Sequence, residues 1–534
     1  MDRRLPEVRR RAVSPRIHIL SISCRSALQI GTTVAGLLAS PAYAQVCPTP
    51  PIAAGSACTV TPGTTVTVST AGATGLAASG ATGQIVGNGI TVNLGAANTS
   101  GAWAQSDASI SFNSSTLTTT AVGAAANGQI GLRASGTGSE VLASGATLTL
   151  APASGTTSNM RGASAESGGS VALTNASVLV RGGVNGLGNY GVQAIGAGSS
   201  LTMTGGSIDT SSRGAFGALA QDGGLITLSG TQITTAGAQN TTTNAGSHAM
   251  TATGPNSRIA GTNVVATTSG TLANLARADT GGTIELISSQ LTNNGAGNVL
   301  NPAAAARITS GGLFRISGVG STLRATGPFG PGVLVEGAGS QAFVTDTAVT
   351  VEGPRSIGVS VKDGASAQLN NASIQVLAST PTGPWSPAVL VETGASATIT
   401  GGQISAQPAN SSGVRALTGA NVTLTGTAIS TAGVDAAGIS AASSTFSATD
   451  FTVVTTGNDN AMGVLADLGS TVQLTRGSIT TSGNQVRAAA FAHALGARNP
   501  GAILIAQGTT THSTGLAAMG IWGDNGGKST SHEV

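Results

Sequence analysis

A repeat of about 25 residues limits what this chain can fold into more than any other feature of the sequence. Six similar segments begin at residues 332, 358, 388, 413, 438 and 463, as GVLVEGAGS, GVSVKDGAS, AVLVETGAS, GVRALTGAN, GISAASS and GVLADLGS. The steps between them are 26, 30, 25, 25 and 25 residues. A period in the twenties is typical of a solenoid, in which each repeat packs only against its neighbours.

Apolar residues recur at constant offsets of 0, 2, 8, 10 and 15 within each repeat. In the repeat that opens at Gly413 they are Val414, Ala416, Val422, Leu424 and Ile429. The same offsets hold in the repeats at 358, 388 and 463, and far upstream from Ala218 and from Ala163, while the repeats at 332 and 438 shift by one residue. Apolar pairs two residues apart indicate strands with one inward face. The pattern predicts an all-β solenoid, a parallel β-helix with three short strands per coil over residues 61–510.

The turn between the second and third strands is short and carries Asn or Gly in most repeats, for example NNAS before Ile374. These residues tolerate the left-handed backbone that a tight corner needs. The repeat at 358 is longer because of an insertion over residues 375–387, with Pro381, Pro384, Trp385 and Pro387. We expect a surface loop there, and similar loops at 237–247 and 295–306. A β-propeller blade or a leucine-rich repeat does not fit the pattern.

Residues 1–44 are predicted to be a signal peptide with an extended basic n-region. The n-region reaches to about Ser26, an apolar run follows over Ala27 to Leu38, and Ala42-Tyr43-Ala44 precedes Gln45. This pattern predicts cleavage between Ala44 and Gln45. A basic tail followed by a buried strand is the alternative. No later apolar run is long enough for a membrane helix, so no membrane span is expected after signal removal.

The net charge of +3 comes from the first 44 residues. They hold seven of the 23 basic residues and two of the 20 acidic ones, which leaves 16 basic and 18 acidic residues, a net charge of −2. Nucleic-acid binding is therefore not expected.

Two cysteines remain after the signal segment, Cys47 and Cys58, in CPTPPIAAGSAC. In an oxidising compartment a disulfide between them is expected, with free thiols as the alternative. A metal site would need more Cys or His ligands nearby. We expect residues 45–60 to form a disulfide loop that caps the first coil.

No constellation of catalytic residues is evident. Polysaccharide lyases and hydrolases with this fold need clustered carboxylates or a basic residue on one strand face. The acids here are scattered, and the nearest pair, Asp435 and Asp459, is expected to consist of solvated turn residues. His248, His493 and His512 lack metal-ligand spacing. We therefore expect no catalytic, cofactor or metal site and no enzymatic activity, with a carbohydrate-active β-helix as the alternative.

The long Arg-rich signal, the disulfide loop and the Gly/Ser/Thr/Asn-rich coils resemble the passengers of bacterial autotransporters of the pertactin-like group. The resemblance implies a right-handed β-helix that acts at the cell surface as an adhesin or other virulence factor, with a host-cell or matrix partner. The family also has a C-terminal translocator barrel in the outer membrane. Residues 511–534 predict only a tail, so we expect a truncated passenger or a separate translocator. Export to the periplasm is expected, and surface display or secretion where a translocator is available.

Overall fold

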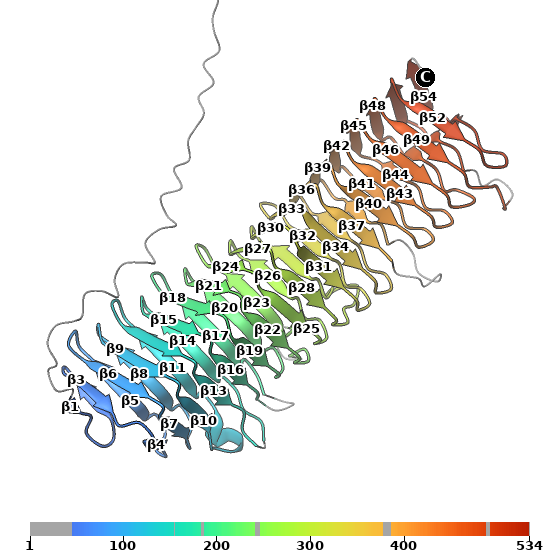
Figure 1. Ribbon diagram of the computed structural model, residues 1–534. Helices are drawn as coiled ribbons and strands as arrows, with labels where there is room; N and C mark the ends of the chain where they lie inside the picture. The colour runs from blue at the N-terminus through green and yellow to red at the C-terminus, as the bar shows by residue number, and fades with distance from the viewer. Residues whose placement is uncertain are drawn as a thin grey trace, which may run out of the picture. The chain divides into compact units, whose positions relative to one another are not determined.

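Each coil of the structure consists of three short strands joined by turns. A computed structural model describes residues 45–153, 155–182, 186–240, 246–377, 386–487 and 492–532. The described part is built from β-strands, apart from a single 3-10 turn, η1 (Gly123–Ala126). The coils stack in chain order along the unit that begins at Gln45, as Figure 1 shows. The prediction of an all-β, parallel β-helix with three strands per coil is confirmed.

The first strands of successive coils pair in parallel and form the first sheet. They are β2 (Ile52–Ala54), β5 (Thr74–Ser79), β8 (Ser100–Gln105), β11 (Ile130–Ser135), β14 (Arg161–Glu166), β17 (Tyr190–Ile195), β20 (Phe216–Gln221), β23 (His248–Thr253), β26 (Ala276–Asp279), β29 (Ala306–Thr309), β32 (Val333–Glu336), β35 (Val359–Lys362), β38 (Val389–Val391), β41 (Val414–Leu417), β44 (Ile439–Ala442), β47 (Val464–Asp467), β50 (Leu495–Arg498) and β53 (Ile521–Asp524).

The second strands of successive coils also pair in parallel and form the second sheet. Its strands are β1 (Gln45–Val46), β3 (Ala57–Val60), β6 (Gln84–Asn88), β9 (Ser109–Asn113), β12 (Glu140–Ser144), β15 (Ser170–Thr174), β18 (Ser200–Thr204), β21 (Leu225–Ser229), β24 (Arg258–Thr262), β27 (Thr283–Ile287), β30 (Leu313–Ser317), β33 (Gln341–Thr345), β36 (Ser366–Asn370), β39 (Ser396–Thr400), β42 (Asn421–Thr425), β45 (Thr445–Thr449), β48 (Thr471–Thr475), β51 (Ile503–Gln507) and β54 (Lys528–His532).

The third sheet closes each coil. Its strands are β4 (Thr65–Val68), β7 (Thr91–Leu94), β10 (Thr116–Thr119), β13 (Thr147–Leu150), β16 (Ser177–Val180), β19 (Ser207–Thr210), β22 (Gln232–Thr235), β25 (Val265–Thr268), β28 (Gln290–Asn293), β31 (Ser321–Ala325), β34 (Thr347–Val351), β37 (Ser373–Val376), β40 (Gln403–Ala406), β43 (Ala428–Thr431), β46 (Thr452–Thr455), β49 (Ser478–Thr481) and β52 (Thr510–Ser513).

The apolar offsets of the repeat coincide with the register of all three sheets. Val389 pairs with Val414 in the first sheet, Ala397 with Val422 in the second, and Ile404 with Ile429 in the third. All of these side chains are buried in one continuous core. The upstream residues that match the offsets, from Ala163 and from Ala218, are buried in the same core. Stacked inward ladders of this kind explain why the repeat is strict in the strands.

Where an apolar position shifts by one residue within a repeat, the turns change in length and the strands still pair in register. Phe446 comes one residue early in its coil and still pairs with Val422, and it is fully buried. Before residue 160 the spacing between coils is less regular, mainly between the third and first strands, where the chain carries η1 and the described residues 151–153 and 155–160. The described residues 237–240, 246, 247 and 295–305 lie at the same corner, between β22 and β23 and between β28 and β29. The loop predicted over 295–306 is exposed around Val299 and Leu300, but Ala303 to Ala306 at its end are buried in the coil.

The turn between the second and third strands has the left-handed backbone that the sequence predicts. Asn371 has a φ of 50° and Gly402 a φ of 74°. Arg476 occupies the same corner with a φ of 52°, although its side chain is long. Its guanidinium donates to both carboxylate oxygens of Asp450, at 2.7 and 2.9 Å, in the corresponding turn of the preceding coil.

Five of the six repeats open with glycine, and here the cause is close packing, not a left-handed backbone. Gly413 does not have a positive φ, but a Cβ there would lie 2.4 Å from Cγ2 of Ile429 and 2.7 Å from the carbonyl oxygen of Gly438. The first strand enters the coil against an inward side chain of the third strand, and the next coil packs directly against its backbone. The small residue is therefore required by close packing.

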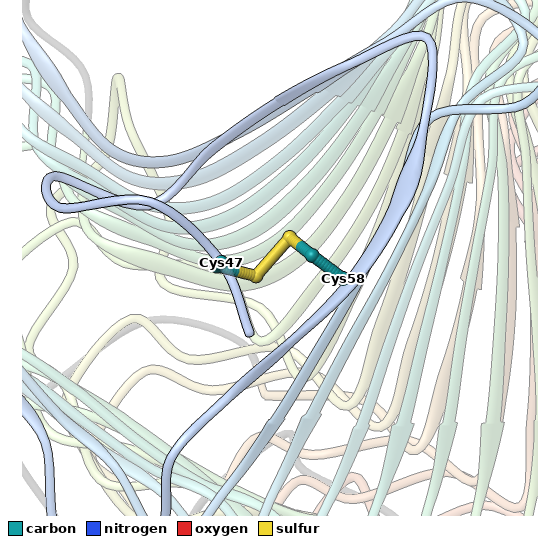
Figure 2. Close-up of a disulfide and its surroundings, with 2 residues drawn as sticks. All are labelled: Cys47 and Cys58. Carbon is teal, nitrogen blue, oxygen red and sulfur yellow. A yellow bond between two sulfur atoms is a disulfide. The ribbon is translucent and has the colours of Figure 1, made fainter. Parts of the chain in front are cut away.

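A disulfide joins Cys47 and Cys58 beside the first coil, as Figure 2 shows. β1 adds to the edge of the second sheet through two residue pairs only, Gln45 with Cys58 and Val46 with Thr59. Both cysteines are buried and belong to the core. The disulfide thus holds a short strand over the end of the second sheet, where no preceding coil covers it.

Among the described residues, no helix is long and apolar enough to cross a membrane.

Replacing both cysteines by serine should release β1 and leave the distant coils unchanged. Closing a loop with a sequence separation of 11 is worth about 3 kcal/mol, and coils interact only with their neighbours. Hydrogen exchange measured by mass spectrometry should show faster exchange over residues 45–60 and no change over residues 413–481. Unchanged protection of residues 45–60 would contradict this role for the disulfide.

Candidate functional site

A groove of about 390 Å³ lies on the outward face of the first sheet, across β32, β35 and β38. Its floor consists of Leu334, Ser360 and Leu390, which pair in register on the three consecutive strands. Leu334 and Ser360 are buried although they point away from the core, between inward residues on the same strands. The sheet therefore presents one serine hydroxyl at the base of a recess, with one leucine on each side of it.

Segments between the third and first strands line one side of the groove. They contribute Asn298, Val299, Pro302, Phe329, Pro331, Arg355 and Ile357. Val299 is 74% exposed, and its neighbour Leu300 is 85% exposed. The guanidinium carbon of Arg355 lies 5.4 Å from the centre of the Phe329 ring, a cation–π contact. This side of the groove is mainly apolar and carries one cation.

Asn293, at the end of β28, anchors the segment that carries Val299. Its Nδ2 lies 2.8, 3.0 and 2.7 Å from the carbonyl oxygens of Ala273, Ala303 and Ala304. Its Oδ1 accepts the backbone N–H of Gly295 at 2.8 Å. The side chain is fully buried. One amide thus ties both ends of the segment 294–305 to the coil.

Ionic groups line the other side of the groove. Lys362 and Glu392 belong to the lining, and Lys362 Nζ lies 3.3 Å from Glu336. Glu336 also accepts from Arg307, with Nε at 2.9 Å and Nη2 at 2.5 Å. Burial alone would raise the pKa of Glu336, but the charge and hydrogen bonds of Arg307, together with Lys362, hold that pKa below 4.5. Glu336 is therefore an ionised partner of two cations.

The pairing of Glu336 predicts a loss of stability in acid. Because its folded-state pKa is lowered, its contribution is present above about pH 4.5 and is lost as the pH falls through the folded value. The urea midpoint should fall between pH 5 and pH 3 and fall less steeply in Glu336→Gln. Glu352→Gln is the control, because its pair with Arg324 is more exposed. Equal acid sensitivity of Glu336→Gln and the unmodified protein would contradict this assignment.

The expectation that Asp435 and Asp459 are solvated turn residues is wrong for Asp459, which is buried. Arg487 bridges the two carboxylates: its Nε donates to Asp459 at 2.8 Å and its Nη2 to Asp435. Asp459 also accepts the backbone N–H groups of Val486 and Arg487. These backbone hydrogen bonds, led by that of Arg487, lower the pKa of Asp459. The cluster ties together three successive segments between the third and first strands, and its cation arises 28 residues after Asp459, beyond the reach of local sequence inspection.

His248 and His493 occupy the same place in two distant coils, two residues before the first inward residue, Met250 and Leu495. Nδ1 of each accepts a backbone N–H of the next coil at 2.9 Å, from Asn274 and from Met519. Burial, followed by the charge of Arg277, lowers the pKa of His248 to about 3. Burial also lowers the pKa of His493. Both are neutral acceptors between coils, whereas His512 lies on β52.

Most of the surface loop predicted over residues 375–387 lies outside the described residues. Pro381, Pro384 and Trp385 lie outside the described residues, as does Ala44 at the predicted cleavage position. Pro387 is buried, and its carbonyl accepts the N–H of Gly358 at 3.3 Å, so it is part of the coil and not of an exposed surface. Gln45 is the first residue of β1.

Sequence inspection missed the groove, although one signal for it is present. The outward position between the two inward residues is Leu in GVLVEG and AVLVET, whereas Arg415, Ser440 and Leu465 occupy it in the next three coils. Single outward leucines are common, but several apolar residues close together on the solvent side can mark an interaction site. The segments that build the opposite wall are not predictable from that position, because they come from neighbouring coils.

No protein-family model matches the chain. No curated protein matches it. Among solved structures, a chain in the cryo-EM structure of the Vag8–C1 inhibitor complex is similar, with 14% identity over 86% of this chain and 100% of that chain, and a TM-score of 0.41. A similarity at this identity and score does not establish a family.

Proposed function

We propose that this protein is an exported, non-enzymatic β-helix of the autotransporter-passenger type that binds a partner at the cell surface. The observation that carries the proposal is the groove over Leu334, Ser360 and Leu390. It is a recess with an apolar floor on a solenoid whose charged residues largely pair with one another across coils. Apolar recesses with a few convergent polar groups are the usual form of binding sites.

Two features of the sequence support export. The Arg-rich segment 1–44 ends in an A-x-A motif before Gln45, and the disulfide between Cys47 and Cys58 suits an oxidising compartment. Expression in a Gram-negative host should yield a periplasmic form whose N-terminal sequence begins at Gln45. A mature N-terminus elsewhere would contradict the proposed signal.

The ionic side of the groove supports binding over catalysis. A general acid needs a raised pKa near the working pH, whereas Arg307 and Lys362 hold the pKa of Glu336 low. Incubation of the protein with pectins and other acidic glycans, with and without calcium, should yield no new reducing ends and no unsaturated products. Either product would favour the carbohydrate-active alternative.

Binding is tested with the purified protein on cultured host cells and on extracellular matrix. The double variant Leu334→Asp, Leu390→Asp places two charges on the floor of the groove. It should reduce binding at least about fivefold, because the charges remove the apolar contact. Ser440→Asp is the matched control, since it lies in the same outward row on β44, outside the groove. Equal binding by the floor variant and the control would exclude the groove as the contact, and no binding by the unmodified protein would overturn the proposed function.

A further inference from the structure

We infer that the groove binds an extended peptide segment in which an aliphatic side chain lies next to an acidic one. This inference rests on the proposed function and names the partner chemistry of the same site. Three properties of the groove support it: the pattern of its floor, its excess of positive charge and its size.

The floor alternates apolar and polar groups. Leu334 and Leu390 lie two coils apart, about 10 Å, with Ser360 between them. The Ser360 hydroxyl has no hydrogen-bond partner among the described residues. An alkyl chain laid across the floor would cover this hydroxyl without pairing it, which is costly. A peptide can place aliphatic side chains on the leucines and offer a backbone group to the hydroxyl.

Cations outnumber carboxylates around the groove. Glu336 is shared by Arg307 and Lys362, and the charge of Glu392 faces Arg415. Arg355 is exposed, and it makes no ion pair with any residue that the structure describes. Four cations therefore face two carboxylates, and Arg355 lies directly beside the apolar wall at Phe329. A carboxylate on the ligand at this point complements the site.

The size of the groove limits the ligand to a short segment. A volume of about 390 Å³ falls in the lower part of the range of ligand sites, roughly 300–1,000 Å³. A few residues of an extended chain fit such a recess, and a folded domain does not. Sequence specificity then comes from side chains that alternate along the segment.

The test is a peptide array of acetylated octapeptides with randomised sequence, incubated with the full purified protein. Retained peptides should be enriched in Leu, Ile or Val within two positions of Asp or Glu. For soluble copies of the best peptides, fluorescence polarisation should show about 5- to 10-fold weaker binding when the acid is replaced by its amide. Arg355→Gln should weaken binding of the acidic peptide by the same factor and leave binding of the amide peptide unchanged. Arg355→Lys should retain part of the preference for the acidic peptide over its amide.

Arg476→Gln is the control, because this arginine lies in a turn of the second sheet, far along the chain from the groove. Circular dichroism and thermal melting of each variant establish that the fold is retained. No retained peptides, or retained peptides without acidic enrichment, would overturn the inference. If cell or matrix binding persists in that case and is lost in the Leu334 and Leu390 variants, the proposed function stands with a different ligand.

Discussion

Gly438→Val is expected to lower the stability of its coil by about 3 kcal/mol, the upper end of overpacking costs. A Cβ at this position would lie 2.3 Å from Cγ1 of Val453 and 2.7 Å from the carbonyl oxygen of Gly463. The first contact is with an inward side chain of the third sheet and the second is with the backbone of the next coil. Rotation of one side chain cannot relieve both contacts, so the strands must separate.

The measurement is urea unfolding followed by circular dichroism, with hydrogen exchange to locate the weakened coil. Ser440→Val is the matched control, because it introduces the same side chain on the outward face of β44, which begins directly after Gly438. The control should change the stability by no more than about 0.5 kcal/mol. The explanation by close packing fails if the two variants unfold at the same urea concentration.

Asn293→Leu is expected to lower local stability by about 3 kcal/mol and to open the groove. The change keeps most of the volume but leaves the carbonyls of Ala273 and Ala303 and the N–H of Gly295 buried without this partner. Each unsatisfied buried group costs about 1–3 kcal/mol. The segment 294–305, which carries Val299 and Pro302 of the groove wall, loses its anchor.

Hydrogen exchange over residues 295–306 should accelerate in this variant, and binding of groove-directed peptides should weaken with it. Asn294→Ala is the control, because the neighbouring side chain is exposed and accepts a single hydrogen bond from Thr326. An Asn293→Leu protein with unchanged exchange in this segment would show that the amide does not hold the wall.

Catalysis, export and partner binding are tested by different measurements and can fail separately. Glycan products would remove the non-enzymatic assignment, and a mature N-terminus away from Gln45 would remove the signal assignment. The peptide array tests Arg355 and the floor without reference to either. Each result therefore changes one part of the functional interpretation.

The sequence alone determined the coil, because the inward positions must be apolar and must recur in register in every strand. The offsets from Val414 to Ile429 predicted the buried residues in coils as distant as that of Ala163, and all of them lie in the core. The Asn and Gly corners were also predictable, since a left-handed backbone favours those residues. A local constraint repeated in each coil leaves a periodic signal in the sequence.

Three features are visible only in the tertiary structure: the groove, the anchor at Asn293, and the bridge from Arg487 to Asp435 and Asp459. These features join residues from two or three coils, at separations that vary with the length of the segments between the third and first strands. The opening glycines were visible as a pattern, but their cause, the contact of Gly413 with Ile429 and Gly438, was not. Contacts between coils of unequal length have no fixed period, and for that reason the sequence did not reveal them.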